Sequence, residues 1–290
     1  YGARDTEAVR HSVANGIFLS VLSSLILTIL CLLSMKPLLT IMNTPENIFD
    51  AAYTYIIAIS IGIAANVFYN LFSAYLRAVG NSQIPLFFLI FSACLNVILD
   101  LLFIIGLQMG VAGAAWATNL AQAISAILCG LYIWLRVPDL KPAPRHWRPS
   151  RLTSRQQLAA GIPMAFQFAI TASGTMIMQS AINLFGSEAV AAFTASGKLM
   201  VLLTQGMVAM GQTMATYGGQ NYGCGDIKRI KAGVRAALIA DSIYSVSMAV
   251  LVYFLLRPCL GLFFSGDVDV NALLPWAKTY SYLCIAFYVP

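Results

Sequence analysis

Eight long apolar segments dominate the sequence and restrict what the chain can fold into. A membrane-spanning helix needs ~20 consecutive, mostly apolar residues. Runs of this kind, separated by turn residues, lie at 11–36, 51–76, 84–106, 111–135, 156–185, 189–216, 228–256 and from 270 onward. Only 10% of the residues are charged, whereas 59% are hydrophobic. The expected fold is therefore an all-α polytopic membrane protein with about eight transmembrane helices.

Positive charge divides the loops between these segments into two sets. If successive segments alternate in direction, one set of loops carries thirteen clear Lys and Arg residues, and the other carries only Lys36 and Arg257. The cation-rich loops, 1–10, 77–83, 136–155 and 217–231, are expected to face the cytoplasm. Membrane topology also explains the net charge of +6 without nucleic acid, because the cations form no stripe with stacking aromatics. We expect a multi-pass protein of the plasma (inner) membrane, surrounded by lipid.

An internal repeat relates the first segment to the seventh. The matching residues, at an offset of 221, are Tyr1 and Tyr222, Gly2 and Gly223, Asp5 and Asp226, Lys36-Pro37 and Arg257-Pro258, and Glu46 and Asp267. The repeating unit is then six helices, and an even number predicts two lobes of the same orientation, related by a pseudo-two-fold axis along the membrane normal. A period of this length predicts a whole protein of roughly 440 residues and twelve helices, of which this chain would hold the third to the tenth.

The longest loop, residues 137–155, is rich in Pro and Arg. It is expected to be a cytoplasmic linker and hinge between two lobes. The amino-terminal lobe would comprise residues 1–136, with helices 3 to 6 of the twelve. The carboxyl-terminal lobe would comprise residues 156–290, with helices 7 to 10.

Three polar residues lie inside two neighbouring apolar segments. Asn96 and Asp100 are four residues apart and so share one helix face. Asp100 and Thr118 each lie roughly 9 to 10 Å from the outer end of their segments, at 1.5 Å per residue. A carboxylate at such a place costs at least ~2.5 kcal/mol, so it indicates a function, either taking up a proton or helping to coordinate Na⁺ with hard oxygen ligands. The residues alone leave open a structural role, or a place in a water-filled vestibule.

Six stretches, in this order and spacing, resemble the multidrug and toxic compound extrusion (MATE) family: YLRAVGNSQIP, LNVILDLLFI, GVAGAAWAT, GIPMAFQF, GSEAVAAF and GQTMATYGGQNYGCGD. The resemblance implies twelve helices in two six-helix lobes, and efflux of organic cations driven by inward H⁺ or Na⁺ through alternating access. Relatives of this type carry an amino-lobe cation site made of a fifth-helix Asn and Asp four apart, a sixth-helix Thr and a first-helix Asp. Asn96, Asp100 and Thr118 match the first three, with Asp100 as the carboxylate that responds to protons. They would also be the metal ligands if the coupling ion is Na⁺.

The carboxyl-terminal segments offer candidates for a substrate cavity. These are polar or flexible side chains in the fifth and sixth apolar segments: Gln167, Gln179, Asn183, Lys198, Gln205, Met178 and Met207. Some relatives have an acidic residue in the seventh helix, but the segment at 156–185 contains none, so a coupling site there is not expected. Hydrogen bonds between helices, snorkelling of Lys198, and ordinary packing of the Met residues stay open as alternatives.

Two other functions compete with secondary efflux transport. A lipid-linked oligosaccharide flippase of the same superfamily would line the lobe interface with several Arg or Lys, whereas Lys198 is the cation well inside a segment. A membrane-embedded enzyme would need a nucleophile with its base or a metal cluster, but His11 and His146 lie at cytoplasmic edges and the six Cys form no CxxC pair. We therefore expect no enzyme activity and no cofactor, a monomeric transporter, and small organic cations as substrates.

Overall fold

The computed structural model describes residues 1–41, 46–261 and 270–287, and every regular element in these ranges is helical. The α-helices are α1 (Thr6–Ile41), α2 (Glu46–Ile61), α3 (Ile63–Ala78), α4 (Gln83–Asp100), α5 (Gly110–Arg136), α6 (Arg151–Ile182), α7 (Ser187–Gly223), α8 (Ile227–Gly261) and α9 (Val270–Phe287). Short π- and 3₁₀-helices complete the list: η1 (Leu101–Gly106), η2 (Pro138–Leu140), η3 (Pro144–Trp147) and η4 (Asn183–Phe185). Each expected apolar segment coincides with one helix or with two consecutive ones, which confirms the all-α fold.

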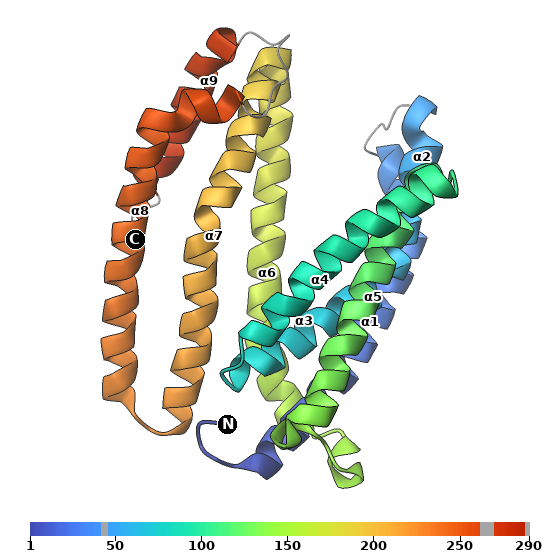
Figure 1. Cartoon of the computed structure of the whole chain (residues 1–290), viewed down its shortest axis with the longest axis vertical. Coiled ribbons are helices and arrows are strands. Elements are labelled where there is room, and N and C mark those ends of the chain that lie inside the picture. Colours follow the sequence, from blue (N-terminus) through green and yellow to red (C-terminus); the bar gives the residue numbers. More distant parts are fainter. Residues whose placement is uncertain (42–45, 262–269, 288–290) are drawn as a thin grey trace. The chain divides into compact units, whose positions relative to one another are not determined.

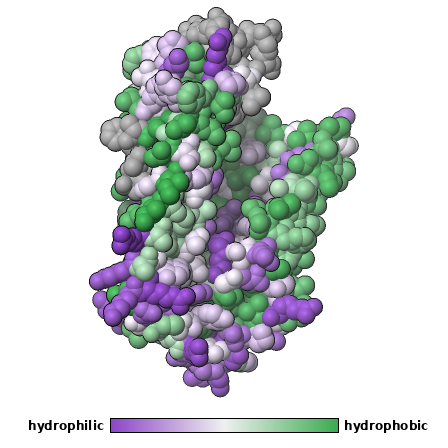
Figure 2. Space-filling model, turned by 60° about the vertical axis from the view of Figure 1, so that its left-hand side comes forward, coloured by the Kyte–Doolittle hydropathy of each residue, from purple (hydrophilic) through white to green (hydrophobic). Residues whose placement is uncertain are grey.

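Five of the described helical segments are long and apolar enough to cross a membrane: α1, α4 with η1, α5, α6 with η4, and α8. The bent pair α2 and α3 would make a sixth. Two of the expected segments correspond to α7 and α9. Over their described residues, these two helices are not among those long and apolar enough to cross a membrane. The exposed surface agrees with a lipid surrounding: hydrophobic side chains cover much of the face shown in Figure 2, and Leu33 of α1 is 74% exposed.

Residues 3–159 form one compact unit, called here the amino unit. Within it, α5 packs against α2, α3 and α4, and α1 packs against α2 and α3 (Figure 1). Small residues such as Ala115, Ala117 and Ala121 are buried along α5, which lets neighbouring backbones approach closely. Helix α5 therefore organises this unit and positions the side chains that it carries against three other helices.

Residues 160–290 form the second unit, called here the carboxyl unit. Helix α7 packs against α8 and α9 around a buried apolar cluster that includes Leu199, Val252 and Leu256 (Figure 1). Helix α6 differs, because no side chain along its length is buried among the described residues. The boundary between the units falls inside α6, a few residues after the linker expected at 137–155.

The predicted repeat reappears in local geometry at the starts of α1 and α8. Asp5 Oδ1 accepts a hydrogen bond from the backbone N–H of Ala8 at 2.9 Å, and Asp226 Oδ1 accepts one from Arg229 N–H at 2.9 Å. Each carboxylate thus caps a free N–H group of the first turn. Both helices also contain a Pro near the end, Pro37 and Pro258. The remaining repeat position, Asp267, lies outside the described residues.

The segment expected as one helix at 51–76 is broken. Helices α2 and α3 meet at Gly62 with a bend of 43°. The N–H of Gly62 donates to the carbonyl of Ile59 at 2.9 Å, three residues back, instead of four as in an α-helix. Apolar periodicity carries no signal of this break, because apolar residues continue on both sides of Gly62.

Candidate functional site

A tight hairpin between α4 and α5 positions the candidate cation site. Helix α4 continues into the π-helix η1, which begins immediately after Asp100. The chain then reverses through Gln108 and Gly110, both with positive φ (52° and 57°). Glycine adopts this backbone conformation without steric cost, so Gly110 suits the start of α5. The reversal brings the end of α4 alongside the start of α5.

Asn96 and Thr118 meet across this hairpin. Asn96 Nδ2 donates to Thr118 Oγ1 at 3.3 Å, and the Thr118 hydroxyl donates to the carbonyl of Ala114, one turn back, at 3.0 Å. These bonds occupy one amide N–H of Asn96 and the hydroxyl proton of Thr118. The amide oxygen of Asn96 and a lone pair of the Thr118 oxygen are left to accept a proton donor or a cation.

Asp100 lies at the junction of α4 and η1, and its side chain is partly buried. Its Oδ1 atom is inaccessible and finds no hydrogen-bond partner within the described part of the chain. A buried acceptor without a partner is costly unless it is protonated or binds a cation. π-Helical turns are often found at functional sites, where the extra residue per turn redirects side chains. The orphaned oxygen therefore fits a group that exchanges a proton or a small cation.

Asn119, the residue after Thr118, is a buried polar group that the sequence reasoning missed. It is 9% exposed, and its Nδ2 donates to the carbonyl of Ala58 on α2 at 2.6 Å. An Asn inside a predicted membrane segment was the available signal, but its partner on α2 depends on tertiary packing.

The polar candidates on α6 and η4 are exposed or partly exposed. Gln167 and Asn183 are exposed and Gln179 is partly exposed. Gln179 Nε2 donates to Asn183 Oδ1 at 3.1 Å, four residues on along the same helical segment. The expected alternative of a hydrogen bond between helices is not found for this pair. Met178 is 45% exposed on the same helix.

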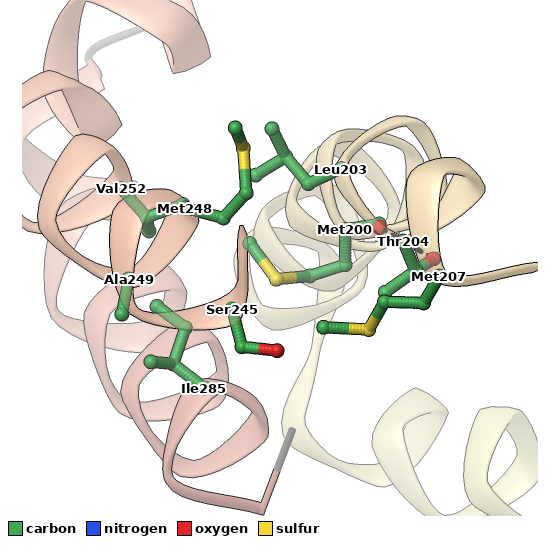
Figure 3. Close-up of a pocket in the computed structure, with 9 residues that line it drawn as sticks. All are labelled: Met200, Leu203, Thr204, Met207, Ser245, Met248, Ala249, Val252 and Ile285. Atoms are coloured by element: carbon green, nitrogen blue, oxygen red, sulfur yellow. Dashed lines mark hydrogen bonds between the residues drawn. The ribbon is translucent and has the colours of Figure 1, made fainter. Parts of the chain in front are cut away.

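The candidates on α7 divide into exposed and packed side chains. Lys198 and Gln205 are exposed. Met207 instead lines a small pocket among α7, α8 and α9 (Figure 3). The pocket is lined by Met200, Leu203, Thr204, Met207, Ser245, Met248, Ala249, Val252 and Ile285. Its side chains are almost all apolar and three are methionines, which adapt readily to differently shaped apolar groups.

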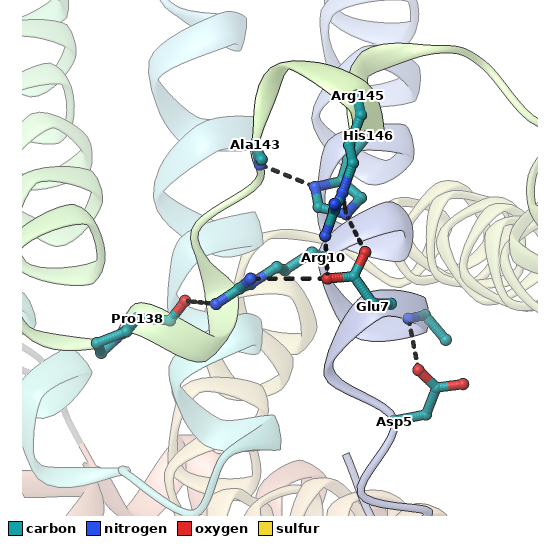
Figure 4. A network of polar contacts seen from close by, with 8 residues as sticks. Asp5, Glu7, Arg10, Pro138, Ala143, Arg145 and His146 are labelled. Carbon is teal, nitrogen blue, oxygen red and sulfur yellow. Dashed lines mark hydrogen bonds and ion pairs between the residues drawn. The ribbon is translucent and has the colours of Figure 1, made fainter.

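The expected linker is fastened to the start of α1 through Glu7. Arg145 Nη2 lies 2.6 Å from Glu7 Oε1, and His146 Nε2 lies 2.8 Å from Glu7 Oε2 (Figure 4). His146 Nδ1 accepts the backbone N–H of Ala143 at 2.8 Å, an arrangement that requires the tautomer with its proton on Nε2, the atom that faces Glu7. The hydrogen bonds from His146 and Arg145 hold the pKa of the Glu7 carboxyl below its ordinary value of 4.5.

Further hydrogen bonds attach the start of α6 to α1. Asn15 Nδ2 donates to Gln157 Oε1 at 2.8 Å, and Ser154 Oγ donates to Asn15 Oδ1 at 3.0 Å. His11 and His146 face each other edge to face, with ring centroids 6.5 Å apart. Residues 138–157 therefore form part of the amino unit, bound to α1 by several polar contacts.

Among the described residues no group of three or more His, Cys, Asp or Glu is placed to hold a metal ion.

Comparison with known proteins gives consistent matches. The profile of the family described as MatE matches residues 1–102 and 163–290. The "probable multidrug resistance protein YpnP" of Bacillus subtilis (strain 168) is 37% identical over 196 residues, which are 67% of this chain and 43% of that protein. The "probable multidrug resistance protein NorM" of Thermotoga maritima is 24% identical over 278 residues, 94% of this chain and 60% of that protein. The chain thus spans about half the length of these curated relatives.

Solved structures share the fold. An outward-facing multidrug resistance MATE family transporter of the MOP superfamily matches with a TM-score of 0.88 and 22% identity, over 99% of this chain and 64% of that one. A MOP superfamily transporter from Pyrococcus furiosus, described as having a binding pocket of reversed polarity, matches with a TM-score of 0.87 and 22% identity, again over 99% and 64%.

Proposed function

Because the chain belongs to the MatE family, we propose that it is part of a cation-coupled antiporter, driven by H⁺ or Na⁺, that exports small organic cations by alternating access. The chain spans 43% and 60% of the curated relatives YpnP and NorM, so the activity is proposed for the full-length protein. That protein would be a monomer of the plasma (inner) membrane, with loops 1–10, 77–83, 136–155 and 217–231 in the cytoplasm.

The orphaned Oδ1 of Asp100 is the observation that carries this proposal. It lies inside a hydrophobic span, on the helix that also carries Asn96. Protonation would neutralise the carboxylate and supply a donor, and Na⁺ would be shared with the free oxygens of Asn96 and Thr118. In either case the bound cation removes an unpaired charge from a medium of low dielectric constant. The part of that gain that differs between two conformations of the amino unit is the energy available to shift one into the other.

Substrate recognition is proposed for the exposed and partly exposed polar side chains of α6, η4 and α7. Gln167, Gln179, Asn183 and Gln205 present amide groups there, with Met178 and Lys198 nearby in the sequence. Amide oxygens and thioethers accept a delocalised organic cation without fixing its shape. Met207 is proposed as a second layer, since it packs into the pocket between α7 and α8.

The alternatives gain less support. A flippase would need several cations along the spans. The described helices hold few Lys or Arg far from their ends: Lys198 of α7, Arg235 of α8 and Lys278 of α9. An enzyme is not supported, because the matched structures are described as transporters.

Ethidium efflux by the full-length protein in proteoliposomes tests the proposal. An imposed pH gradient and an imposed Na⁺ gradient are applied separately, and one of them is expected to drive efflux. Asp100→Asn should strongly reduce the response, whereas Asp241→Asn, a matched change at an acid of α8, should keep it. Absence of gradient-driven efflux in the parent protein would refute the proposal.

A further inference from the structure

The break between α2 and α3 leaves a backbone carbonyl without its helical partner. In an unbroken helix the N–H of Gly62 would donate to the carbonyl of Ala58. It donates to Ile59 instead, and the Ala58 carbonyl accepts the side-chain N–H of Asn119 at 2.6 Å. A polar side chain that satisfies a freed carbonyl is a recognised way to stabilise a bend in a membrane helix.

Asn119 and Gly62 are also fitted to each other sterically. A Cβ atom placed on Gly62 would overlap the side-chain amide of Asn119, with Oδ1 as its nearest atom. Glycine is therefore required at the break while Asn119 keeps its place. The contact is buried, since Asn119 is 9% exposed, so water does not easily replace the donated hydrogen bond.

The position of Asn119 connects this break to the candidate cation site. It directly follows Thr118, whose hydroxyl accepts the hydrogen bond from Asn96 on α4. Successive residues of a helix point about 100° apart. Helix α5 thus bonds α4 through one residue and α2 through the next, and a rotation or shift of α5 caused at one contact necessarily acts on the other.

We propose that Asn119 is a positioning residue that holds the bend between α2 and α3 and couples its angle to cation occupancy at Asn96, Asp100 and Thr118. The coupling part of this inference rests on the proposed cation site. The chemistry of the contact rests only on the hydrogen bond to Ala58 and the close approach of Gly62.

Efflux by the full-length protein gives the first test. Asn119→Asp keeps the shape of the side chain but removes the N–H donor, so we expect the maximal rate of cation-driven efflux to fall about tenfold with the substrate KM changed less than about twofold. Ser125→Ala is the matched control, because Ser125 of α5 also donates to a carbonyl of a neighbouring helix, that of Phe88, but away from the break. The control should keep nearly the parent rate. An Asn119→Asp rate equal to that of the parent would overturn the inference.

A steric test uses the pair at the break. Gly62→Ala should lower the yield of folded protein, because the added methyl overlaps Asn119. Gly62→Ala combined with Asn119→Ala should recover yield relative to Gly62→Ala alone, since the smaller side chain makes room. No recovery would contradict the proposed contact.

A distance measurement separates positioning from general stability. Spin labels at Thr54 and Ala74, exposed on α2 and α3, report the bend in full-length protein whose native cysteines have been replaced. In the parent the distance should differ between cation-loaded and cation-free conditions, and in Asn119→Ala it should not respond. A parent without cation-driven efflux would refute the proposed function and the coupling together. A parent that couples normally, with an Asn119→Ala distance that still responds, would refute the role of Asn119 alone.

Discussion

Two pairs of polar residues with the same spacing have different hydrogen-bond partners in this protein. Asn96 and Asp100 of α4, and Gln179 and Asn183 of α6 and η4, are each four residues apart in an apolar segment. In the second pair the amides bond each other along one helix. In the first, Asn96 bonds Thr118 of another helix, and Asp100 keeps an unpaired buried oxygen. Polar spacing alone does not create a coupling site; a neighbouring helix must complete it.

The two helical surroundings explain the difference. Helix α4 packs against α5, which offers Thr118 at the matching level, whereas no side chain of α6 is buried among the described residues. Within the carboxyl unit, the described hydroxyl groups of α6 donate to backbone carbonyls of their own helix, four residues back. Thr171 and Ser180 are examples. A side chain without a neighbouring partner satisfies its polar atoms locally.

The largest expected effect is at Asp100. Asp100→Asn removes the ionisable group while keeping size and shape, so gradient-driven efflux should fall about a hundredfold, the range of a lost charge-assisted interaction. Substrate binding in the absence of a gradient should persist, measured by the quenching of bound ethidium. A variant that still couples efflux to H⁺ or Na⁺ would place the coupling group elsewhere.

A smaller effect is expected at Thr118. Thr118→Val keeps the volume but removes the hydroxyl that accepts from Asn96, so the cation concentration for half-maximal efflux should rise about three- to tenfold. The maximal rate should change less. Thr171→Val is the control, because the Thr171 hydroxyl bonds only its own helix. Equal effects of the two changes would remove the distinction drawn between α5 and α6.

Changes to the amide pair Gln179 and Asn183 should alter the apparent affinity for substrate and leave the cation dependence of efflux unchanged. Gln179→Ala removes one neutral hydrogen-bonding group from the exposed face, so the substrate KM should rise about two- to fivefold while the cation dependence stays that of the parent. Efflux assayed over a range of ethidium and cation concentrations separates the two quantities. A shifted cation dependence would mean that both polar pairs take part in coupling.

The smallest effect is expected at Glu7, where polar contacts again join distant segments of the amino unit. The pKa of Glu7 is lowered in the folded protein, so its contribution to holding the linker is present above pH 4.5 and is lost as the pH falls through the lowered pKa. Glu7→Gln should therefore loosen the linker at neutral pH, seen as faster tryptic cleavage after Arg145 or Arg151. Asp139→Asn, at an exposed acid of η2, is the control. Unchanged cleavage in Glu7→Gln would show that other contacts hold the linker.

The helices of this protein could be predicted from its sequence, but their interruptions could not. All eight apolar segments became helices, and the repeat at Asp5 and Asp226 reappears as equivalent helix caps. The break at Gly62 and the π-helix after Asp100 were not predicted. Both depend on contacts with α5 or on the local hydrogen-bond register, to which hydrophobic periodicity is insensitive. Asn119 was passed over for the same reason, because nothing near it in sequence indicates a carbonyl 61 residues away.

The sequence by itself determined that this chain is a bundle of membrane helices, because long uncharged segments must satisfy their backbone hydrogen bonds internally in lipid. It also determined which polar residues lie inside those helices. Only the tertiary structure decided which of them meet. In the folded protein, Asn96 bonds Thr118, and an oxygen of Asp100 has no partner among the described residues. Asn119 bonds the carbonyl of Ala58 that is freed at the break, and Gln179 bonds Asn183 of its own helical segment. Such pairings follow from which helices are neighbours and at what level, and these are set by packing over the whole unit.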